Sequence, residues 1–512
     1  MTKLRPCLPC ALCLVAWICA VGVLRGQRGS TAAPRYEVAY ATYLGGPHWD
    51  QAREVIPYPD GTVLVGGMTS SSTMPTTPGV VQPTYAGDDP SRGHGGVVGG
   101  DGFLIHLSAD GSKVLACTYF GGSKQERGVY GMLIDSGGNI VIGSATRSSD
   151  MPTTEGSYQP KYGGGQADMY AAKLSPDMKQ ILWCTYVGST NNDWPRGGIA
   201  LDDQDNVYLC GGANSKSFPT TEGAFQRVLK GERDGAIVKL SADGSKLLFS
   251  TLLGGSDWDG IMGLDLDAAG NLYVAGHTRS PDFPVTPGAP GPEFSGNSDC
   301  FMTKLSSDGS KLVYSTYLGG AENEFAEHRP WLEPDGTLLL TGVTSSPDFP
   351  TTAGAHQRSL RGKNDGFLTK MSADGKSFAF STLLGGSAGG EFYLMPTPDR
   401  AGSIFVVGHT TSPDFPVTAT ALQPTFGGGK PPQGGDGSLA ILNPNASRVI
   451  YATFLGGSGD DLIRSVALGP RGEVYLVGST SSPDFPVTPN AIQSRYVDKG
   501  DAFIVKLVPT AR

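Results

Sequence analysis

The chain has 512 residues, of which 74 are glycine and 37 are proline, so these two residue types fill about 22% of all positions against roughly 12% in an average protein. So much glycine argues against a mostly helical protein, because each glycine inside a helix costs about 1 kcal/mol relative to alanine. An apolar share of 39% excludes a disordered linker, and the glycines lack the three-residue period of collagen. The composition therefore predicts a turn-rich, strand-rich globular protein.

The N-terminus has the pattern of a secretory signal. Lys3 and Arg5 precede an apolar run over residues 7–24, and small residues at 31–33 offer a cleavage site. We expect a signal peptide over 1–33 and an exported protein, extracellular, at the cell surface or periplasmic. The alternative is an uncleaved anchor, for which a run of about 18 residues is marginal. No later segment is apolar enough to predict a membrane span.

Removal of residues 1–33 would leave 35 basic and 48 acidic residues. Such an acidic protein is a poor candidate for binding nucleic acid or anionic lipid. The four later cysteines are too few for a disulfide scaffold, and we expect them to be buried as small apolar residues. They are Cys117, Cys184, Cys210 and Cys300.

Three sequence blocks recur seven times in constant order. The first is a Thr-x-x-Gly-Gly block whose first glycines are spaced by 76, 67, 66, 65, 66 and 71 residues. The second is a Pro-Asp-Phe-Pro type loop whose last proline recurs at Pro75, Pro152, Pro219, Pro284, Pro350, Pro416 and Pro486. The third is an aspartate that opens a strand, at Asp101, Asp168, Asp234, Asp299, Asp365, Asp436 and Asp501. We expect these aspartates to be structural.

Each repeat contains four short strand-like runs. In the fourth repeat these are 261–266, 271–276, 300–305 and 312–318, separated by Gly-Asn or Asp-Gly pairs that suit tight hairpins. Apolar residues occupy both odd and even positions along the strands, as expected for sheets that are covered on both faces. Seven such units predict one all-β domain over 34–512, a seven-bladed β-propeller. The last repeat lacks a fourth strand, so we expect residues 36–44 to complete it and close the ring.

The repeat resembles a known family. Four motifs carry the resemblance: Tyr314-Ser-Thr-Tyr-Leu-Gly-Gly320, Gly270-Asn-Leu-Tyr-Val-Ala-Gly276, Ser280-Pro-Asp-Phe-Pro-Val-Thr286 and Asp501-Ala-Phe-Ile-Val-Lys-Leu507. They are similar to the bacterial SBBP-type β-propeller repeat over about residues 36–508. The resemblance implies exported or surface-attached bacterial proteins and specifies no activity. The third repeat departs from the pattern, with Gly188-Ser189 in place of Gly-Gly.

Strand order predicts which face carries function. If the first strand of each blade is innermost, the long second-to-third loops and the links between blades share one face. We call it the long-loop face, and it is the functional candidate because long loops commonly carry binding residues. The inserts at 85–100 and 427–435 would lie at its rim.

Each link carries an acid four residues after its second glycine position, or five in the sixth unit, and together we call these the link acids: Asp50, Glu126, Asp193, Asp259, Glu324, Glu391 and Asp461. A ring of such acids around the channel mouth predicts a cation or polyol site, or a pair of acid/base carboxylates. The alternative is that each acid accepts backbone N–H bonds and ties neighbouring blades together.

Tryptophans flank three of the link acids, at Trp49, Trp194 and Trp258. In one interpretation the tryptophan rings stack on sugar rings while the acids bind the sugar hydroxyls. In the other, the tryptophans pack at the edges of the blades. No histidine spacing fits a metal site, and a calcium-loop resemblance at 265–270 lacks the later glutamate. Calcium is thus the one ion that the sequence leaves open, and no other cofactor is indicated.

The sequence favours a non-catalytic, monomeric binding scaffold without catalytic residues. Its expected partner is a glycan or a cell-surface protein, bound at the long-loop face. One alternative is a carbohydrate-active hydrolase or lyase that uses the link acids. The other is a structural component of the cell envelope.

Overall fold

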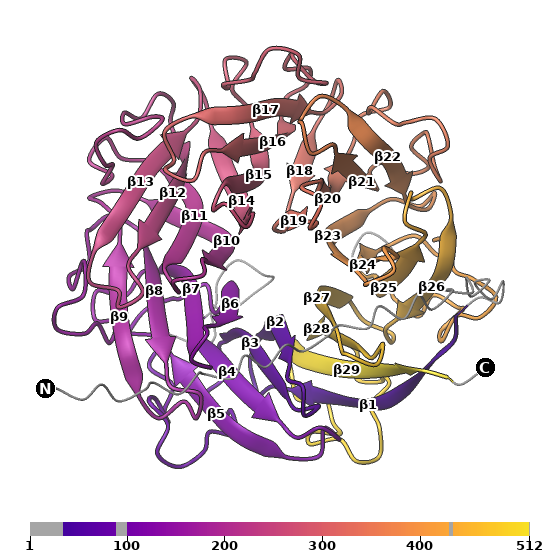
Figure 1. The fold of residues 1–512 in the computed structure, drawn as a ribbon. Helices are drawn as coiled ribbons and strands as arrows, with labels where there is room; N and C mark the ends of the chain where they lie inside the picture. Colours follow the sequence, from indigo (N-terminus) through magenta and orange to yellow (C-terminus); the bar gives the residue numbers. More distant parts are fainter. Residues whose placement is uncertain (1–33, 89–99, 430–433, 511–512) are drawn as a thin grey trace, which may run out of the picture. The chain divides into compact units, whose positions relative to one another are not determined.

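The computed structural model describes residues 34–88, 100–429 and 434–510, and within these the side chains of 194–197 and 393 are not described. The chain divides into two units, 1–33 and 34–512. The second unit is a ring of seven β-sheets around a central axis (Figure 1). The described residues form no helix. They therefore contain no helix that is long and apolar enough to cross a membrane.

Each blade is an antiparallel sheet whose strands follow one another from the channel outward. Blade 1 contains β2 (Asp50–Pro57), β3 (Val63–Thr69), β4 (Asp101–Leu107) and β5 (Val114–Phe120). Blade 2 contains β6 (Gly131–Ile134), β7 (Ile140–Thr146), β8 (Asp168–Leu174) and β9 (Ile181–Val187). Blade 3 contains β10 (Asp193–Leu201), β11 (Val207–Ala213), β12 (Asp234–Leu240) and β13 (Leu247–Leu253). Blade 4 contains β14 (Asp259–Leu266), β15 (Leu272–Thr278), β16 (Asp299–Leu305) and β17 (Leu312–Leu318).

The remaining blades follow the same plan. Blade 5 contains β18 (Glu324–Ala326), β19 (Trp331–Leu332), β20 (Leu338–Thr344), β21 (Asp365–Met371) and β22 (Phe378–Leu384). Blade 6 contains β23 (Glu391–Pro398), β24 (Ile404–Thr410), β25 (Asp436–Leu442) and β26 (Val449–Leu455). Blade 7 contains β27 (Asp461–Leu468), β28 (Val474–Thr480), β29 (Asp501–Pro509) and β1 (Tyr36–Leu44).

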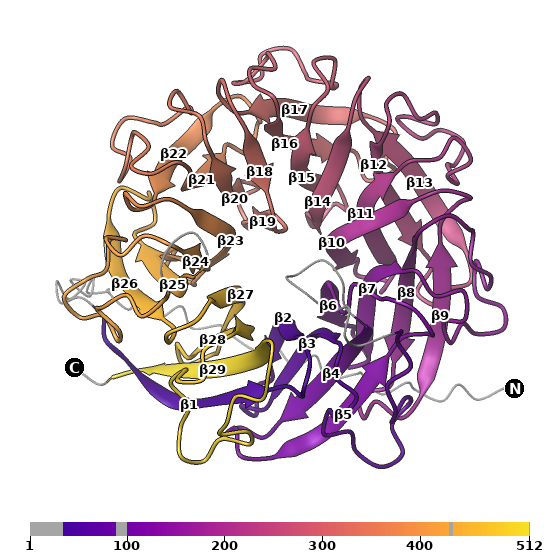
Figure 2. The same cartoon turned by 180° about the vertical axis from the view of Figure 1, so that it is seen from behind.

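The two ends of the propeller meet in blade 7. Strand β1 pairs antiparallel with β29, in a register that runs from Tyr36 opposite Pro509 to Leu44 opposite Ala502. Figures 1 and 2 show β1 lying along the outer edge of β29 from both sides of the ring. The prediction that residues 36–44 complete the last blade is confirmed, and so is the seven-bladed all-β fold.

The hydrophobic core is divided among the spaces between neighbouring blades. Between blades 3 and 4, for example, Tyr208 and Ile237 pack with Ile261 and Val274 in one buried cluster. Because a blade contributes one side of its sheet to each of two such clusters, its middle strands are buried on both faces, which explains their apolar residues at both parities. All four predicted core cysteines are buried free thiols.

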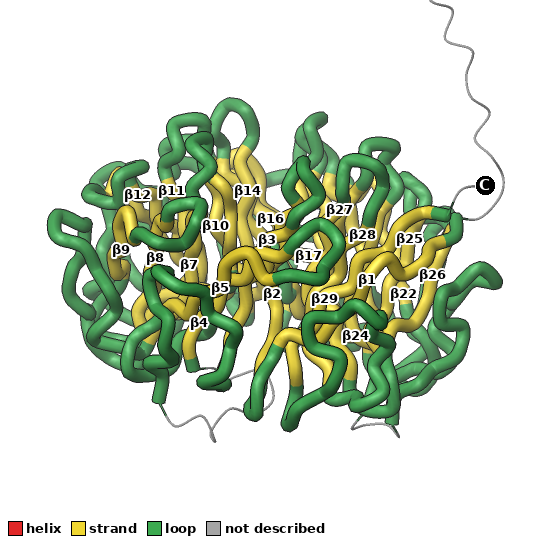
Figure 3. Tube along the Cα trace, turned by 90° about the horizontal axis from the view of Figure 1, so that it is seen from below, coloured by secondary structure: helices red, strands yellow, loops and turns green. Residues whose placement is uncertain are grey.

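Loops and turns separate onto the two faces of the ring. The strands run between these faces, as the side view shows (Figure 3). The long loops and the links lie together on one face, because the backbone N–H of Ser256 in a link donates to Asp282 Oδ1 in a long loop at 2.7 Å. The short turns, such as those at Gly270 and Gly309 with φ of +77° and +66°, lie at the other ends of the strands. We call that side the tight-turn face.

A β-bulge recurs in the innermost strands. The register against the second strand shifts at Arg53 in blade 1, at Met262 in blade 4 and at Arg464 in blade 7. Each of these residues is the third after its link acid. A bulge turns one extra side chain out of the regular alternation, and all three side chains line the central channel.

Candidate functional site

The link acids lie where the innermost strands begin, but their side chains are buried. All seven, Asp50, Glu126, Asp193, Asp259, Glu324, Glu391 and Asp461, are at most 1% exposed. In blade 4 the carboxylate of Asp259 accepts bonds from the N–H of Gly255 at 2.7 Å and from the hydroxyl of Ser280 at 2.9 Å. Each of the other six link acids accepts the corresponding bond from a backbone N–H of its link, for instance Asp193 from Ser189 N at 2.7 Å. This geometry favours the alternative in which the acids tie the links to the blades.

The strand-opening aspartates lie directly opposite the link acids. In blade 1 a Cβ added to Gly121 would lie 2.3 Å from Glu126 Oε2 and 2.7 Å from Asp101 Oδ1, so the two carboxyls face each other across this glycine. The other carboxyl oxygen of Asp101 accepts bonds from Gln82 Nε2 and from the N–H of Ala86, both at 2.8 Å. These aspartates therefore anchor the long loops, in agreement with a structural role.

The predicted aromatic residues do not form a single platform. Trp49 is 8% exposed and packs beside Gly500. Trp258 is partly exposed and stacks on His277 with ring centroids 4.8 Å apart, while the guanidinium of Arg233 lies 5.1 Å from its ring. The side chain of Trp194 lies outside the described residues, as do 89–99 and 430–433 of the predicted rim inserts.

A polar cluster in the middle of the central channel was not found from the sequence. We call it the channel cluster: Arg53, Glu54, Tyr130, Glu327, His328, Arg329 and Arg464. The Arg53 guanidinium lies 3.9 Å from the centre of the Tyr130 ring. Arg464 Nη1 lies 3.9 Å from Glu327 Oε2. Arg53 and Arg464 are 6% and 5% exposed, so both charges are largely withdrawn from bulk water.

Blade 5 brings three members of the cluster into the channel by interrupting its innermost strand. Strand β18 ends at Ala326 opposite Gly342, and β19 resumes at Trp331 opposite Leu339, so four residues face only two on β20. One of the four is Pro330, which has no N–H to donate to the ladder. The segment also packs closely against blade 4, since a Cβ on Gly263 would lie 2.2 Å from Arg329 Cα.

The electrostatics of the cluster set the charge of its histidine and of one glutamate. Burial, together with the arginines Arg464, Arg53 and Arg329, lowers the pKa of His328 to about 3, so this imidazole is neutral at physiological pH. Among the described residues its Nε2 has no hydrogen-bond partner. Burial raises the pKa of Glu54 to about 7, against the opposing effect of Arg329 and Arg53.

The channel widens below the cluster, toward the tight-turn face. There a cavity of about 740 Å³ is lined by ends of innermost strands and the turns after them, with Tyr58, Trp331, Phe405 and Val466 among its apolar walls. We call it the vestibule. The space within the channel cluster itself is about 20 Å³, enough for one water-sized group. Glu54, Arg329 and Met395 line both spaces, so the cluster forms the inner end of the vestibule.

The sequence held one signal for this site. At the third position after the link acid the repeats carry Arg53, Met262, Glu327 and Arg464, whereas a purely structural position would keep one residue type. The calcium expectation gains no support from the turn at 265–270, where Asp267 pairs with Lys304 at 3.1 Å and accepts bonds from Asn271. Among the described residues no three His, Cys, Asp or Glu side chains gather as a metal site.

Comparison with known proteins adds no functional assignment. No protein-family model matches the chain, and no curated protein matches it. A protein of unknown function from Dyadobacter fermentans DSM 18053 is 12% identical with a TM-score of 0.39, over 93% of this chain and 100% of that one. A quinohemoprotein alcohol dehydrogenase from Pseudomonas putida HK5 is 9% identical with a TM-score of 0.41, over 93% and 77%. A europium-containing methanol dehydrogenase is 10% identical with a TM-score of 0.42, over 92% and 93%. At these similarities none of the three indicates a function for this chain.

Proposed function

We propose that this chain is an exported, non-catalytic binding protein that holds a small organic carboxylate in its central channel, with an apolar body in the vestibule. One observation carries the proposal. Three arginines, Arg53, Arg329 and Arg464, gather with the half-buried His328 around one small space at the inner end of a largely apolar cavity. The basic N-terminal segment and the SBBP-type resemblance support export.

The chemistry of the channel cluster suits a carboxylate. Guanidinium groups bind carboxylates through two parallel N–H···O bonds, and partial burial strengthens these bonds. The neutral imidazole of His328 adds a polar nitrogen that has no partner among the described residues. Glu54, with a pKa near 7, can be protonated and so need not repel the ligand. The free space in the cluster admits one water-sized group, so one carboxylate oxygen would enter it from the vestibule.

The vestibule suits the rest of such a ligand. Its volume of about 740 Å³ lies within the 300–1,000 Å³ typical of small-molecule sites. Trp331, Phe405 and Tyr58 supply apolar and aromatic surface, and the two prolines Pro57 and Pro59 stiffen its rim. Entry is from the tight-turn face, whereas the sequence had favoured the long-loop face.

A binding role is proposed rather than catalysis because the acids named for a hydrolase or lyase are buried and hydrogen-bonded to the blades. The glycan or surface-protein partner expected at the long-loop face stays a prediction. Its remaining support is the partly exposed ring of Trp258, since Trp49 is buried.

Isothermal titration calorimetry with octanoate and octanamide tests the proposal. The two probes share an apolar body and differ in charge. We expect octanoate to bind at least tenfold more tightly than octanamide, and Arg329→Gln to remove most of that difference. Arg227→Gln, an exposed arginine in a long loop, is the matched control and should leave both affinities unchanged. Equal affinity for the two probes, or no binding of either, would overturn the proposal.

A further inference from the structure

A lysine–acid pair recurs on the tight-turn side of the blades. The lysine comes from the third strand and the acid from the turn that follows the innermost strand. The pairs are Lys173–Asp135 at 2.9 Å, Lys239–Asp202 at 2.9 Å, Lys304–Asp267 at 3.1 Å and Lys370–Glu333 at 2.7 Å. Blades 2, 3, 4 and 5 therefore each neutralise a largely buried ammonium with a carboxylate of the chain.

Blade 7 keeps the lysine and lacks the acid. Lys506 stands opposite Tyr475, as Lys304 stands opposite Tyr273 in blade 4. Asp267 is the eighth residue after its link acid, and the eighth after Asp461 is Gly469. One change of residue thus removes the carboxylate that the repeat pattern supplies.

The environment of Lys506 leaves its charge without a counter-ion. Lys506 is 7% exposed, so its side chain is largely withdrawn from water. Among the described residues it makes one hydrogen bond, from Nζ to the carbonyl of Ala109 at 3.2 Å, and no ion pair. The rings of Tyr475 and Tyr40 lie 5.1 and 5.8 Å from Nζ and compensate part of the charge. An ammonium can donate three bonds, and withdrawing it from water unpaired is costly.

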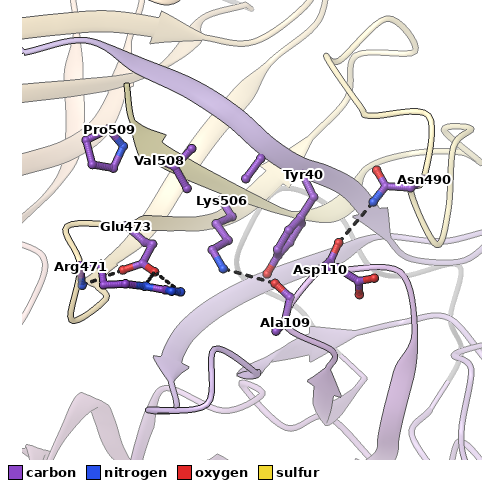
Figure 4. A pocket seen from close by; sticks show the side chains of 10 residues that line it. Tyr40, Ala109, Asp110, Arg471, Glu473, Asn490, Lys506, Val508 and Pro509 are labelled. Atoms are coloured by element: carbon purple, nitrogen blue, oxygen red, sulfur yellow. Dashed lines mark hydrogen bonds and ion pairs between the residues drawn. The ribbon is translucent and has the colours of Figure 1, made fainter. Parts of the chain in front are cut away.

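An open cavity of about 530 Å³ lies beside Lys506 (Figure 4). Two acids line this cavity, but each is already engaged elsewhere. Glu473 pairs with Arg471 at 2.9 Å. The carboxylate of Asp110 accepts bonds from the hydroxyls of Ser108 and Ser112 at 2.6 and 2.8 Å. Figure 4 shows a dashed line from the ammonium of Lys506 to Ala109 and none from it to either of these carboxylates.

Blade 3 provides an internal comparison. A groove of about 400 Å³ occupies the equivalent place there, lined by Lys239, Phe249 and Asp308, which correspond to Lys506, Tyr40 and Asp110. In that groove Lys239 is paired with Asp202. The two grooves share the lysine, the aromatic ring opposite it and the aspartate of the next blade, and in the groove of blade 3 the chain supplies the counter-ion of the lysine.

We propose that the groove at Lys506 binds a carboxylate group from outside the chain, which takes the place of the missing aspartate. The contact is a charge-assisted hydrogen bond from Nζ to a carboxylate oxygen, strengthened because the ammonium is already largely desolvated. The carboxylate can belong to a free small molecule or to an acidic side chain of a peptide. The site is separate from the channel cluster and does not depend on the function proposed for it.

Two variants test this site. Lys506→Met removes the ammonium. Gly469→Asp combined with Glu473→Asn rebuilds the pair as blade 4 has it, with Asp267 and Asn271 four residues apart. The second change is needed because a Cβ on Gly469 would lie 2.6 Å from Glu473 Oε2. Since the rebuilt turn copies one already present in the protein, we expect this variant to fold.

The measurement is calorimetric titration with sodium acetate against sodium chloride at equal ionic strength, and with acetyl-Gly-Asp-Gly-amide against its Asn counterpart. We expect carboxylate-specific binding that is weakened at least tenfold by Lys506→Met and by the rebuilt variant, each measured in the Arg329→Gln background so that the channel cluster does not contribute, and that is kept in Arg329→Gln alone. Without ligand, the rebuilt variant should melt at a higher temperature than the natural chain. Acetate binding alone identifies a free carboxylate as the source, and peptide binding alone identifies an acidic side chain. Binding of neither probe, or full binding by the rebuilt variant, overturns the proposal.

Discussion

The facing carboxyls of Asp101 and Glu126 predict a specific dependence of stability on pH. Both groups are at most 1% exposed, and they meet across Gly121. Burial raises the pKa of Asp101 to about 7, and burial together with the charge of Asp101 raises the pKa of Glu126 well above its usual value. Two neighbouring buried carboxylates repel each other when both are ionised, so we expect the pair to hold at least one proton at neutral pH.

The sign follows from comparing folded and unfolded chains. The unfolded carboxyls lose their protons near pH 4, whereas in the folded pair Asp101 keeps its proton up to about pH 7 and the pKa of Glu126 also lies well above its usual value. The folded state therefore binds more protons between these values, and stability is greatest below pH 4 and falls as pH rises through 7. One retained proton corresponds to about 1.4 kcal/mol for each pH unit. Between pH 5 and pH 7 the proton on Asp101 alone should therefore lower the free energy of unfolding by about 3 kcal/mol.

Asp101→Asn isolates the effect. The new amide oxygen can accept the bonds from Gln82 and Ala86, and its NH₂ group faces Glu126 in place of a second acid. We expect the variant to be more stable than the natural chain at pH 8. Its free energy of unfolding should fall less steeply with pH, by about 1.4 kcal/mol per pH unit, which corresponds to one proton. The assay is guanidinium unfolding at several pH values from 5 to 8.

Asp110→Asn in the same blade is the control for loss of one negative charge. Hydrogen bonds from Ser108 and Ser112 lower the pKa of this exposed carboxyl to about 2, so it does not titrate in the range tested. Its slope between pH 5 and 8 should match that of the natural chain. The reasoning is refuted if Asp101→Asn also leaves the slope unchanged, or if it is less stable than the natural chain at pH 8.

Three further predictions concern closure, packing and the channel. Deletion of 36–44 should lower the melting temperature sharply, because β29 loses its partner strand and the last blade its outer layer; an unchanged value would contradict the closure. Gly319→Ala should destabilise the fold by about 1–3 kcal/mol in guanidinium unfolding, since its Cβ would lie 2.3 Å from Asp299 Oδ1; a neutral effect would show that the carboxyls separate easily. Nitrogen NMR should find His328 neutral down to pH 5, because burial and nearby arginines lower its pKa to about 3; protonation above pH 5 would remove this description of the channel.

Local features of the sequence were sufficient to predict the architecture. Turn pairs such as Gly270-Asn271 and the alternation within 312–318 act over a few residues, and their sevenfold recurrence sets the number of blades. The incomplete last repeat predicted that 36–44 would close the ring, and the pairing of β1 with β29 confirms it. The link acids lie at or near the start of the innermost strands, and their side chains are buried.

The candidate sites depended on information that no single repeat contains. Arg53, Arg329 and Arg464 come from blades 1, 5 and 7 and meet only because the ring closes, and bulges direct Arg53 and Arg464 into the channel. The donors to a link acid come from its own link and from the long loop of its own blade, as Gly255 and Ser280 do for Asp259, and the folded loop is needed to bring them together.

The sequence by itself determined the repeat, the strand order and the closure, because hydrogen-bonded turns and strand periodicity are local properties. The tertiary structure decided which faces and grooves carry chemistry. Lys506 illustrates the division: the sequence shows a repeat lysine with Gly469 in place of the usual acid, and only the packing of blade 7 against blade 1 shows that no other carboxylate among the described residues pairs with its ammonium. The lysine–acid pairs form within single blades, but the burial of charge arises where blades pack together, from residues that lie far apart along the chain.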